Sequence, residues 1–317
     1  MTPSVLVIGT VFVDCKGLAK QNYQSSARNL GEIRFVHGGV GRNVAENLAK
    51  LSLSTCFISS VDISAMGEEV VSKLQESHVN ISYLIKAENR GMGIWMAIID
   101  DKGDLAGSIS QMPDLALLEE FILQNGEKFI QEATHIVLEV DLNISITQRI
   151  ISLARKEKKP VYGIPGNFSV VISHSDILGQ LECFICNNFE ADLLIHPNFT
   201  HMNTNQKLNE LMHFVDRIGI RSMIVTMGKH GSIYYDCKSK ARGYQPVFPV
   251  TLIDSSGAGD AFFSGTVMGL VRGLTIKEAV ICGTKVAGWT IESIENTYPD
   301  LSMKIRQDEF FKSLKLN

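Results

Sequence analysis

Short apolar runs alternate with amphipathic stretches along most of this chain. The first run, residues 5–8, is followed by Gly9 and is typical of a short buried strand that ends at a turn. Similar runs predict further strands at residues 54–60, 82–86, 135–140, 160–164, 183–187 and 221–226. Between them, apolar residues recur at helical spacing and predict helices at residues 42–51, 66–77, 115–132, 145–157 and 204–217.

This alternation predicts the fold class. Strands that are separated by helices usually pair in parallel through right-handed crossovers. We therefore expect an α/β fold in which helices flank a mostly parallel central sheet, formed by residues 1–317 as a single domain. In such sheets ligands bind at the carboxyl ends of the strands, so the chemistry is expected there.

Two segments break the alternation. Residues 11–37 and 91–110 contain strand-like sequence without an intervening helix, including a turn at 100–103. We expect these segments to form a small β-sheet that projects from the main domain as a lid. A lid commonly excludes water from a site. It can also pair with a second subunit, so the sequence leaves a homodimer through the lid open.

Composition and charge exclude several classes of function. The 317 residues are 45% apolar, which is enough for a large core. A formal charge of −4 offers no positive excess for binding a nucleic acid polymer. No apolar stretch reaches the roughly 18 residues of a membrane span, and the first residues lack a secretion signal. We therefore expect a cytoplasmic protein with neither a membrane nor a nucleic acid partner.

The six cysteines are dispersed along the chain, as is typical of thiols in a reducing compartment. Cys183 and Cys186 form a C-x-x-C motif, which occurs in redox and zinc sites. No second pair accompanies them, and the surrounding residues are apolar. The pattern therefore favours packed thiols.

A run of small residues is the strongest candidate for chemistry. Gly257, Ala258 and Gly259 stand directly before an apolar helix predicted over 261–271. A turn of small residues at a helix start leaves backbone N–H groups unpaired and directed at one point, where the helix dipole adds positive potential. We therefore predict an anion-binding turn.

Asp260 follows this turn directly. An isolated acid in the first turn of a helix more often caps the helix. Beside an anion site, however, a carboxylate can accept the proton of a substrate hydroxyl while that hydroxyl attacks phosphorus. Neither the P-loop motif nor the protein-kinase glycine motif occurs in the chain. Phosphoryl transfer would therefore need a different scaffold.

A second glycine cluster precedes the first long helix and contains Gly38, Gly39 and Asn43. Its spacing is compatible with a flexible junction that leads into a helix. It also suits a close approach of the backbone to a small polyol, because Asn43 offers both a donor and acceptors. Spacing alone leaves both interpretations open.

Together, the two clusters resemble the two signatures of the ribokinase-like (PfkB) family of carbohydrate and nucleoside kinases, in the expected order. Further agreement comes from Asp14 after the first strand, from an N-x-x-E motif and from a T-x-G-x-x-G motif; these motifs supply Asn187, Glu190, Thr226, Gly228 and Gly231. Within the family, residues 22–23, 31–43 and 295–302 are most similar to pseudouridine kinases. The resemblance implies a ribokinase-like fold and a phosphotransferase with an alcohol group as acceptor.

The resemblance also implies roles for individual residues on the acceptor side. Asp260 would take the proton from the 5′-hydroxyl, and the amides of residues 257–259 would stabilise charge on the phosphoryl group. The ribose hydroxyls would contact Asp14, Gly38, Gly39 and Asn43.

On the nucleotide side, the resemblance implies a site for ATP and Mg²⁺. Glu190, with Asn187, would organise Mg²⁺ through water, whereas without the family context Glu190 could be an exposed acid at a helix start. Thr226, Gly228 and Gly231 would line the nucleotide site. K⁺ near Asp254 is common in the family, so the sequence leaves a monovalent cation open.

Two segments depart from the family pattern. At residues 62–67 the family's G-x-D-x-x-G lacks its first glycine and its acid. At residues 164–170 the D-P-x-S-x-x-K segment of pseudouridine kinases lacks both charged residues. Because the predicted catalytic turn is intact, these departures bear on the substrate more than on phosphoryl transfer.

Three hypotheses follow from the sequence. The leading one is ATP-dependent phosphorylation of pseudouridine to pseudouridine 5′-phosphate. The second is a kinase of the same family that acts on another sugar or nucleoside, of the ribose, fructose, adenosine or inosine type. The third is a non-catalytic protein that senses a nucleoside.

Overall fold

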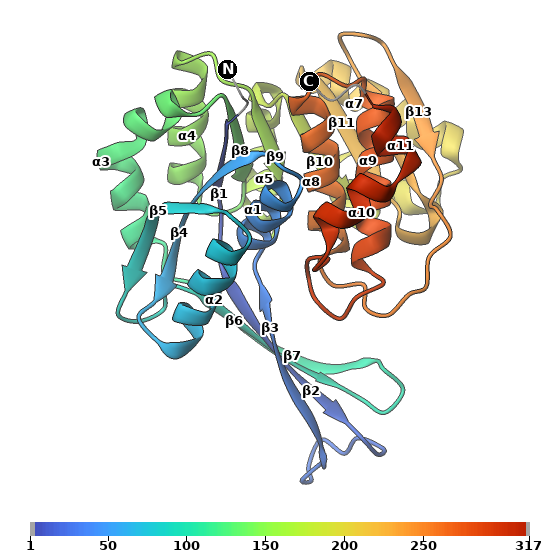
Figure 1. Cartoon of the computed structure of the whole chain (residues 1–317). Helices are drawn as coiled ribbons and strands as arrows, with labels where there is room; N and C mark the ends of the chain where they lie inside the picture. The colour runs from blue at the N-terminus through green and yellow to red at the C-terminus, as the bar shows by residue number, and fades with distance from the viewer. Residues whose placement is uncertain (1–3, 315–317) are drawn as a thin grey trace.

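The computed structural model describes residues 4–314 (Figure 1). Within these residues, a nine-stranded sheet has the spatial order β13-β12-β11-β10-β9-β8-β1-β4-β5. Its strands are β1 (Ser4–Ile8), β4 (Ser54–Asp62), β5 (Asn80–Ala87), β8 (His135–Glu139), β9 (Val161–Ile164), β10 (Cys183–Asn187), β11 (Ser222–Thr226), β12 (Ser232–Asp236) and β13 (Arg242–Gln245). All neighbours from β5 to β11 are parallel, and only the pairs that involve β12 and β13 are antiparallel. The predicted mostly parallel sheet is confirmed.

Helices cover both faces of this sheet. The α-helices of the described chain are α1 (Val40–Lys50), α2 (Ala65–Glu76), α3 (Ala116–Glu132), α4 (Ile144–Lys156), α5 (Ser169–Ser173), α6 (Asn188–Leu194), α7 (Thr204–Ile218), α8 (Ala258–Val271), α9 (Ile276–Thr290), α10 (Leu301–Gln307) and α11 (Glu309–Ser313). One apolar cluster joins α3, α4 and α7 to the sheet, and the other joins α1, α2, α8 and α9. The sheet therefore lies between two layers of helices.

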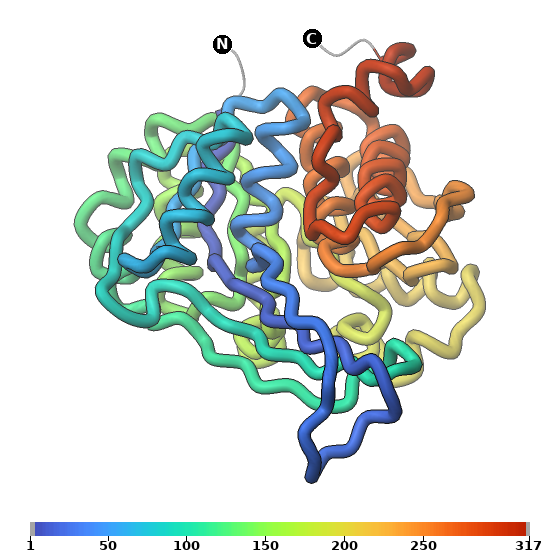
Figure 2. The backbone as a smooth tube through the Cα atoms, turned by 60° about the horizontal axis from the view of Figure 1, so that its bottom comes forward, coloured from blue at the N-terminus to red at the C-terminus, as the bar shows by residue number. Residues whose placement is uncertain are grey.

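The four remaining strands form a separate sheet with the order β3-β2-β6-β7, which we call the lid. They are β2 (Phe12–Ala19), β3 (Gly31–Gly38), β6 (Gly93–Ile99) and β7 (Leu105–Gln111). The lid projects from the body in Figure 1, and in Figure 2 the β2–β3 hairpin, in blue, extends beyond the rest of the backbone. A small sheet therefore forms from the two segments in which the sequence predicted it.

The second half of the chain differs most from the expectation. The sequence predicted neither β12 and β13 nor the helices α5, α6, α9, α10 and α11. The predicted helix over 261–271 begins earlier, at Ala258. Hydrophobic periodicity is weak in α8 because most of its residues are buried on every side, and such a helix shows no amphipathic stripe.

The thiols of Cys183 and Cys186 lie in the core. They project from opposite faces of β10, since each belongs to a different apolar cluster. Burial raises the pKa of both thiols far above the ordinary value. The prediction of packed thiols is confirmed. No helix within residues 4–314 combines the length and apolar composition needed to cross a membrane.

Candidate active site

Four parallel strands end at the same edge of the large sheet, and candidate residues lie at or just after these ends. β1 leads through Gly9 to Thr10, β8 ends at Glu139, and β10 and β11 end at Asn187 and Thr226, which are register partners. This edge is the one at which parallel sheets bind ligands.

Asp260 and Asn43 meet although 217 residues separate them. Asn43, in the first turn of α1, donates from Nδ2 to Asp260 Oδ2 at 2.7 Å. Arg42 in turn donates to Asn43 Oδ1, which fixes the orientation of the amide. Arg42 is itself held by Glu46, and both side chains are buried. A rigid ion pair on α1 therefore sets the contact with α8.

The turn at 257–259 lies at the start of a helix, as the sequence predicted. Gly257 is the N-cap of α8 with φ of 74°, and no side chain caps this helix within the described part of the chain. The capping interpretation of Asp260 is therefore not what the structure shows. A Cβ atom on Gly257 would lie 2.1 Å from the carbonyl oxygen of Asn296, so only glycine fits there.

The three backbone N–H groups of the turn differ in their hydrogen bonding. The N–H of Ala258 donates to the carbonyl of Ser255 at 3.3 Å. The N–H groups of Gly257 and Gly259 have no hydrogen-bond partner among residues 4–314. Space around Gly259 is open, since no atom lies within 4 Å of where its Cβ would be. Two free amides and an open approach suit a bound anion.

The protonation of Asp260 is shifted by its surroundings. The pKa of Asp260 is raised from 3.8 to about 7, chiefly by burial; the Asn43 hydrogen bond opposes this shift, and the nearby charge of Glu139 contributes to it. A carboxyl group with a pKa near neutrality can gain and lose a proton at physiological pH, as general acid–base chemistry requires.

Glu139 is a site residue that the sequence analysis missed. Its side chain is buried and accepts hydrogen bonds from the backbone N–H of Thr10 at 2.8 Å and from Thr10 Oγ1 at 3.0 Å. Burial raises its pKa, and the hydrogen bonds from Thr10 oppose the shift. A usable signal existed, because Glu139 is an acid directly after an apolar strand.

Asp14 lies on β2 at the base of the lid, and Gly38 lies next to it. A Cβ on Gly38 would lie 2.7 Å from Asp14 Oδ1. Burial raises the pKa of Asp14, and the hydrogen bond from Asn296 opposes this shift. Gly39 is the N-cap of α1, and its carbonyl accepts from the N–H of Asn43 at 2.9 Å. The second glycine cluster is thus a helix start beside an acid.

Asn296 bridges these parts. Its Nδ2 donates to Asp14 Oδ2 at 3.1 Å and to the carbonyl of His37 at 2.9 Å. Its Oδ1 is buried and has no hydrogen-bond partner in the described range 4–314. Sequence resemblance pointed to this segment, but only the structure reveals that Asn296 connects the lid base to the turn at 257–259.

The predicted nucleotide-side residues form a second group with local contacts. Asn187 Oδ1 accepts from the N–H groups of Phe189 and Glu190, both at 2.9 Å, and Glu190 Oε2 accepts from the N–H of Asn187 at 2.7 Å. This capping box starts α6. Burial raises the pKa of Glu190. Thr226, Gly228 and Gly231 form the turn between β11 and β12.

The two groups are linked through a row of acids. Glu139 affects the pKa of Asp260, and Asp141 affects the pKa values of both Glu139 and Glu190. Within residues 4–314, no three acidic, histidine or cysteine side chains gather to hold a metal ion by themselves. A single carboxylate, Glu190, fits the role of binding a hydrated Mg²⁺ through water, since Mg²⁺ commonly keeps several of its waters.

The two segments that depart from the family pattern are well ordered by other contacts. Asp141 accepts hydrogen bonds from the N–H groups of Gly166 and Val170, both at 3.0 Å, and so shapes the loop 164–170. In the segment 62–67, Ser64 caps α2 by accepting from the N–H of Gly67 at 3.1 Å. Neither segment touches Asp260 through a described hydrogen bond.

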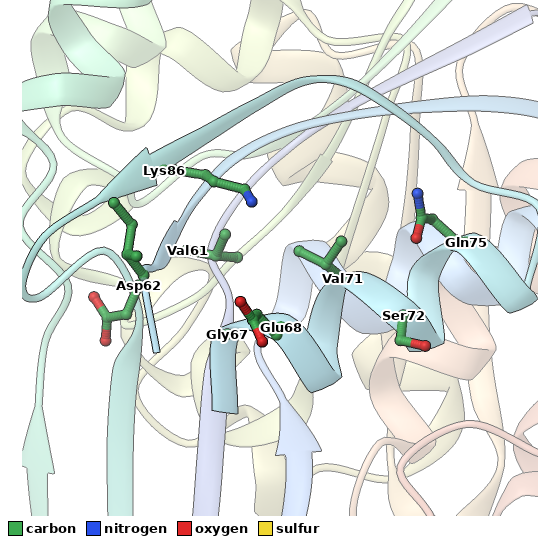
Figure 3. Close-up of a pocket in the computed structure, with 9 residues that line it drawn as sticks. Val61, Asp62, Gly67, Glu68, Val71, Ser72, Gln75 and Lys86 are labelled. Atoms are coloured by element: carbon green, nitrogen blue, oxygen red, sulfur yellow. The ribbon is translucent and has the colours of Figure 1, made fainter. Parts of the chain in front are cut away.

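Two hollows of the surface lie apart from these groups. A pocket of about 110 Å³ lies between β4, β5 and α2, where Val61, Val71 and Lys86 face it (Figure 3). A groove of about 950 Å³ runs along the opposite edge of the sheet, past His135, Val161 and Arg221. The candidate site residues at the carboxyl edge line neither of these two hollows.

Known proteins match this chain over most of its length. The family described as pfkB family carbohydrate kinase matches residues 2–302. A guanosine-inosine kinase of Exiguobacterium acetylicum is 35% identical over 295 residues, which cover 92% of this chain and 95% of the relative. The pseudouridine kinase of Escherichia coli (strain K12) is 27% identical over 300 residues, which cover 94% of each chain.

Solved structures show the same fold. The ribokinase of Arabidopsis thaliana, complexed with ribose and ATP, matches with a TM-score of 0.80 at 18% identity and covers 98% of this chain and 99% of that one. The ribokinase of Thermotoga maritima matches with a TM-score of 0.79 at 18% identity, with coverage of 96% and 100%. The fold is ribokinase-like, as the sequence predicted.

Proposed function

Because this chain belongs to the pfkB family of carbohydrate kinases, which transfer phosphate to a hydroxyl group, we propose that it phosphorylates the primary hydroxyl of a nucleoside with ATP. One observation carries the proposal: Asp260, with a pKa of about 7, stands beside the free amides of Gly257 and Gly259. A base and an anion site are thus adjacent.

The first step assigned to the chain is proton removal. The Asp260 carboxylate accepts the proton of the substrate hydroxyl as its oxygen attacks phosphorus, an effect worth about 10²- to 10⁴-fold in rate. The hydrogen bond from Asn43 leaves Asp260 Oδ1 without a described side-chain partner, so this oxygen is the acceptor we assign to the reaction.

The second step is charge stabilisation on the transferring phosphoryl group. The N–H groups of Gly257 and Gly259 donate to its oxygens, and the amino end of α8 adds positive potential. We assign a weaker part to the N–H of Ala258, because it already bonds to the carbonyl of Ser255.

The ribose is held on the lid side. Asp14 accepts from sugar hydroxyls, Gly38 and Gly39 allow the backbone to approach the sugar, and Asn43 orients the reacting end. A substrate hydroxyl would also satisfy the buried Oδ1 of Asn296, which otherwise lacks a partner among residues 4–314. An orphan acceptor next to Asp14 supports this placement.

ATP belongs at the ends of β10 and β11, where we assign Asn187, Glu190, Thr226, Gly228 and Gly231 to the nucleotide. Mg²⁺, when bound with ATP, neutralises charge on the phosphates. Glu190 would orient the water ligands of the Mg²⁺ ion. The capping box fixes the Glu190 carboxylate for this purpose.

A monovalent cation near Asp254 is less strongly supported. The ammonium of Lys16 already lies 3.0 Å from Asp254 Oδ2. Since this oxygen already has a cation from the protein itself, we propose that K⁺ does not bind at Asp254 Oδ2.

We place purine nucleosides, guanosine and inosine, first among the acceptors. The sequence analysis put pseudouridine first, but identity to the guanosine-inosine kinase is 35% against 27% for the pseudouridine kinase. The altered segment 164–170 also lacks the two charges typical of pseudouridine kinases. Pseudouridine remains the second candidate, supported by the similarity at 31–43.

A substrate panel tests the proposal. Purified protein with ATP and Mg²⁺ is given guanosine, inosine, adenosine, pseudouridine, ribose or fructose, and ADP release is followed. We expect the highest kcat/KM with guanosine or inosine, and a loss of about 10²-fold or more in Asp260→Asn. Absence of ADP release with all six acceptors would contradict the kinase assignment.

The same variant tests the alternative of a nucleoside sensor. Asp260→Asn keeps the oxygen that accepts from Asn43, so nucleoside binding by calorimetry is expected to persist while turnover disappears. Binding without turnover in the unaltered protein would instead favour the sensor.

We further propose that the chain forms a homodimer through the outer face of the lid. Ile33, Phe35, Met96 and Ile109 are 43–69% exposed there, and Phe35, Met96 and Ile109 lie in one row across the sheet through Cys15. A contiguous exposed apolar face usually marks an interaction surface. Phe35→Ser combined with Ile109→Ser is expected to halve the mass measured by light scattering, and an unaltered mass of one chain would overturn the dimer.

Location follows from the chemistry. Six cysteines are free in the described chain, and ATP is an intracellular phosphate donor. We therefore propose that the protein works in the cytoplasm.

A further inference from the structure

A partly buried ion pair joins the lid to the segment that leads into the anion-binding turn. Lys16 Nζ, on β2, lies 3.0 Å from Asp254 Oδ2 and donates to Ser256 Oγ at 2.9 Å. The Lys16 side chain is only 11% exposed and that of Asp254 31% exposed. The chain separation is 238 residues, so this contact exists only because the lid lies against the body.

Both oxygens of Asp254 are used. While Oδ2 binds the ammonium, Oδ1 accepts the N–H of Ser256 at 2.8 Å. Ser256 directly precedes Gly257, whose N–H is one of the two free amides. The ammonium, the carboxylate and the hydroxyl thus hold the entry to the anion-binding turn from one side.

The other side of the entry is held by the body. The N–H of Ile253 donates to the carbonyl of Ile291, just after α9, at 2.8 Å. Asp254 therefore lies between an anchor on the body and an anchor on the lid. Without Lys16, one of the two anchors is lost, and a half-buried carboxylate loses its cation.

Lys16 also shares a face of the lid with the acid assigned to the sugar. Alternate residues of a strand point to the same side, so Asp14 and Lys16 both face inward, whereas Cys15 lies in the apolar outer row. One strand therefore presents both a sugar contact and the contact to the turn.

We propose that Lys16 is a positioning residue that fixes the anion-binding turn only when the lid lies against the body. Seating of the sugar on Asp14 and ordering of the amides at 257–259 then become one event, which prevents phosphate from being activated before the acceptor is in place. The role in catalysis rests on the proposed kinase function, whereas the coupling of lid and turn does not.

Burial by itself would raise the pKa of Asp254, but the hydrogen bonds from Ser256 and Lys16 outweigh burial and hold it below the usual range. The carboxylate is thus charged and available to Lys16 at neutral pH.

The first experiment is hydrogen exchange on Lys16→Met, Lys16→Arg and the control Lys20→Met. Lys20 follows the same strand but is exposed. In Lys16→Met, the hydrogen-bonded amides of Asp254, Ser256 and Ala258 are expected to exchange about tenfold faster, while Lys16→Arg and Lys20→Met keep the protection. Unchanged exchange in Lys16→Met would overturn the coupling, even if the protein proved not to be a kinase.

The second experiment is a double-mutant cycle on turnover. Lys16→Met is expected to lower kcat by about 10- to 100-fold with a nucleoside Kd within about threefold, because the turn is displaced but Asp14 and Asn43 remain. Combined with Asp254→Asn, it should cost no more than Asp254→Asn alone. Losses that multiply, or a Kd that rises in step with the fall in kcat, would show that Lys16 acts separately from the turn.

Lys16→Arg keeps the cation and is expected to recover most of the turnover lost in Lys16→Met. If the Lys16 side chain only filled space, Lys16→Arg would not recover this turnover. Equal losses in Lys16→Arg and Lys16→Met, with both proteins folded, would contradict the assignment. Should the unaltered protein show no turnover with any acceptor, the proposed function fails, and the exchange data alone decide the coupling.

Discussion

The group proposed for the acceptor side (Asp14, Asn43, Asp260 and Asn296) and the pair proposed for the nucleotide side (Asn187 and Glu190) are held by different kinds of contact. On the acceptor side, Asn43 meets Asp260 across 217 residues and Asp14 meets Asn296 across 282. On the nucleotide side, Asn187 and Glu190 hold each other within three residues. The first group depends on the body and the lid being assembled, whereas the second forms wherever α6 starts. We therefore expect substitutions in the first group to change turnover. Substitutions in the second group should change either stability or the Mg²⁺ requirement, but not both together.

The two glycines of the turn give the largest expected effect. Gly259→Ala adds a Cβ to open space inside a helix, so stability should rise by about 0.5–1 kcal/mol. The same methyl group occupies the approach of the phosphoryl group, and kcat/KM should fall on the order of 10²-fold because the group is displaced. Thermal unfolding and steady-state kinetics measure both. A Gly259→Ala protein with full activity would mean that the anion does not approach there.

Gly257→Ala is the matched control. Its Cβ would lie 2.1 Å from the Asn296 carbonyl at φ of 74°, so we expect a loss of about 1–3 kcal/mol of stability together with activity. If Gly257→Ala and Gly259→Ala prove equally stable, the surroundings of the two glycines do not differ as described.

The pH dependence of turnover is the next effect in size. Because Asp260 must be deprotonated to act as a base and its pKa is about 7, kcat/KM should rise about tenfold per pH unit below 7 and level off above it. Asn43→Leu removes a hydrogen bond that lowers this pKa, so the midpoint should move to higher pH. A midpoint near 4 would show that another group limits the reaction.

The same shift has a consequence for stability. The pKa of Asp260 is raised from 3.8 to about 7 on folding, so this group stabilises the folded state fully below pH 4. That contribution is lost as pH rises through 7. Compared with Asp260→Asn, the unaltered protein should lose unfolding free energy between pH 4 and 7, as urea unfolding at each pH would measure.

Glu190→Gln gives a smaller effect that isolates charge from structure. Glutamine preserves the capping box, so thermal stability should change little. The Mg²⁺ concentration needed for half-maximal turnover should rise about tenfold, as for other residues that act through metal-bound water. An unchanged Mg²⁺ requirement would remove Glu190 from the nucleotide site and leave it as a helix cap.

Asn187→Ala gives the smallest effect and the opposite pattern. It removes the acceptor for the N–H groups of Phe189 and Glu190, so α6 should lose about 1 kcal/mol. Turnover at saturating Mg²⁺ should fall by less than about fivefold, because the charge of Glu190 remains. If the loss of turnover, expressed as free energy, exceeds the loss of stability, Asn187 contacts the nucleotide directly.

Amino-acid sequence alone determined the local features. Apolar periodicity specified the parallel strands of the large sheet and the helices α1, α2, α3, α4 and α7, because one face of each element must be buried. The small residues at 257–259 predicted a turn with free amides at a helix start, since such amides depend only on nearby backbone. Likewise, Asn187 and Glu190 could be recognised from their spacing.

Only the tertiary structure decided which distant residues meet. Glu139, Asn296 and Lys16 carry no local pattern that assigns them to Asp260, Asp14 and Asp254, because charge interactions and hydrogen bonds between residues more than 100 positions apart depend on how the sheets order their strands. The pKa of Asp260 is likewise decided by the tertiary structure. Its value near 7 comes from burial and neighbouring charge, which exist only after folding.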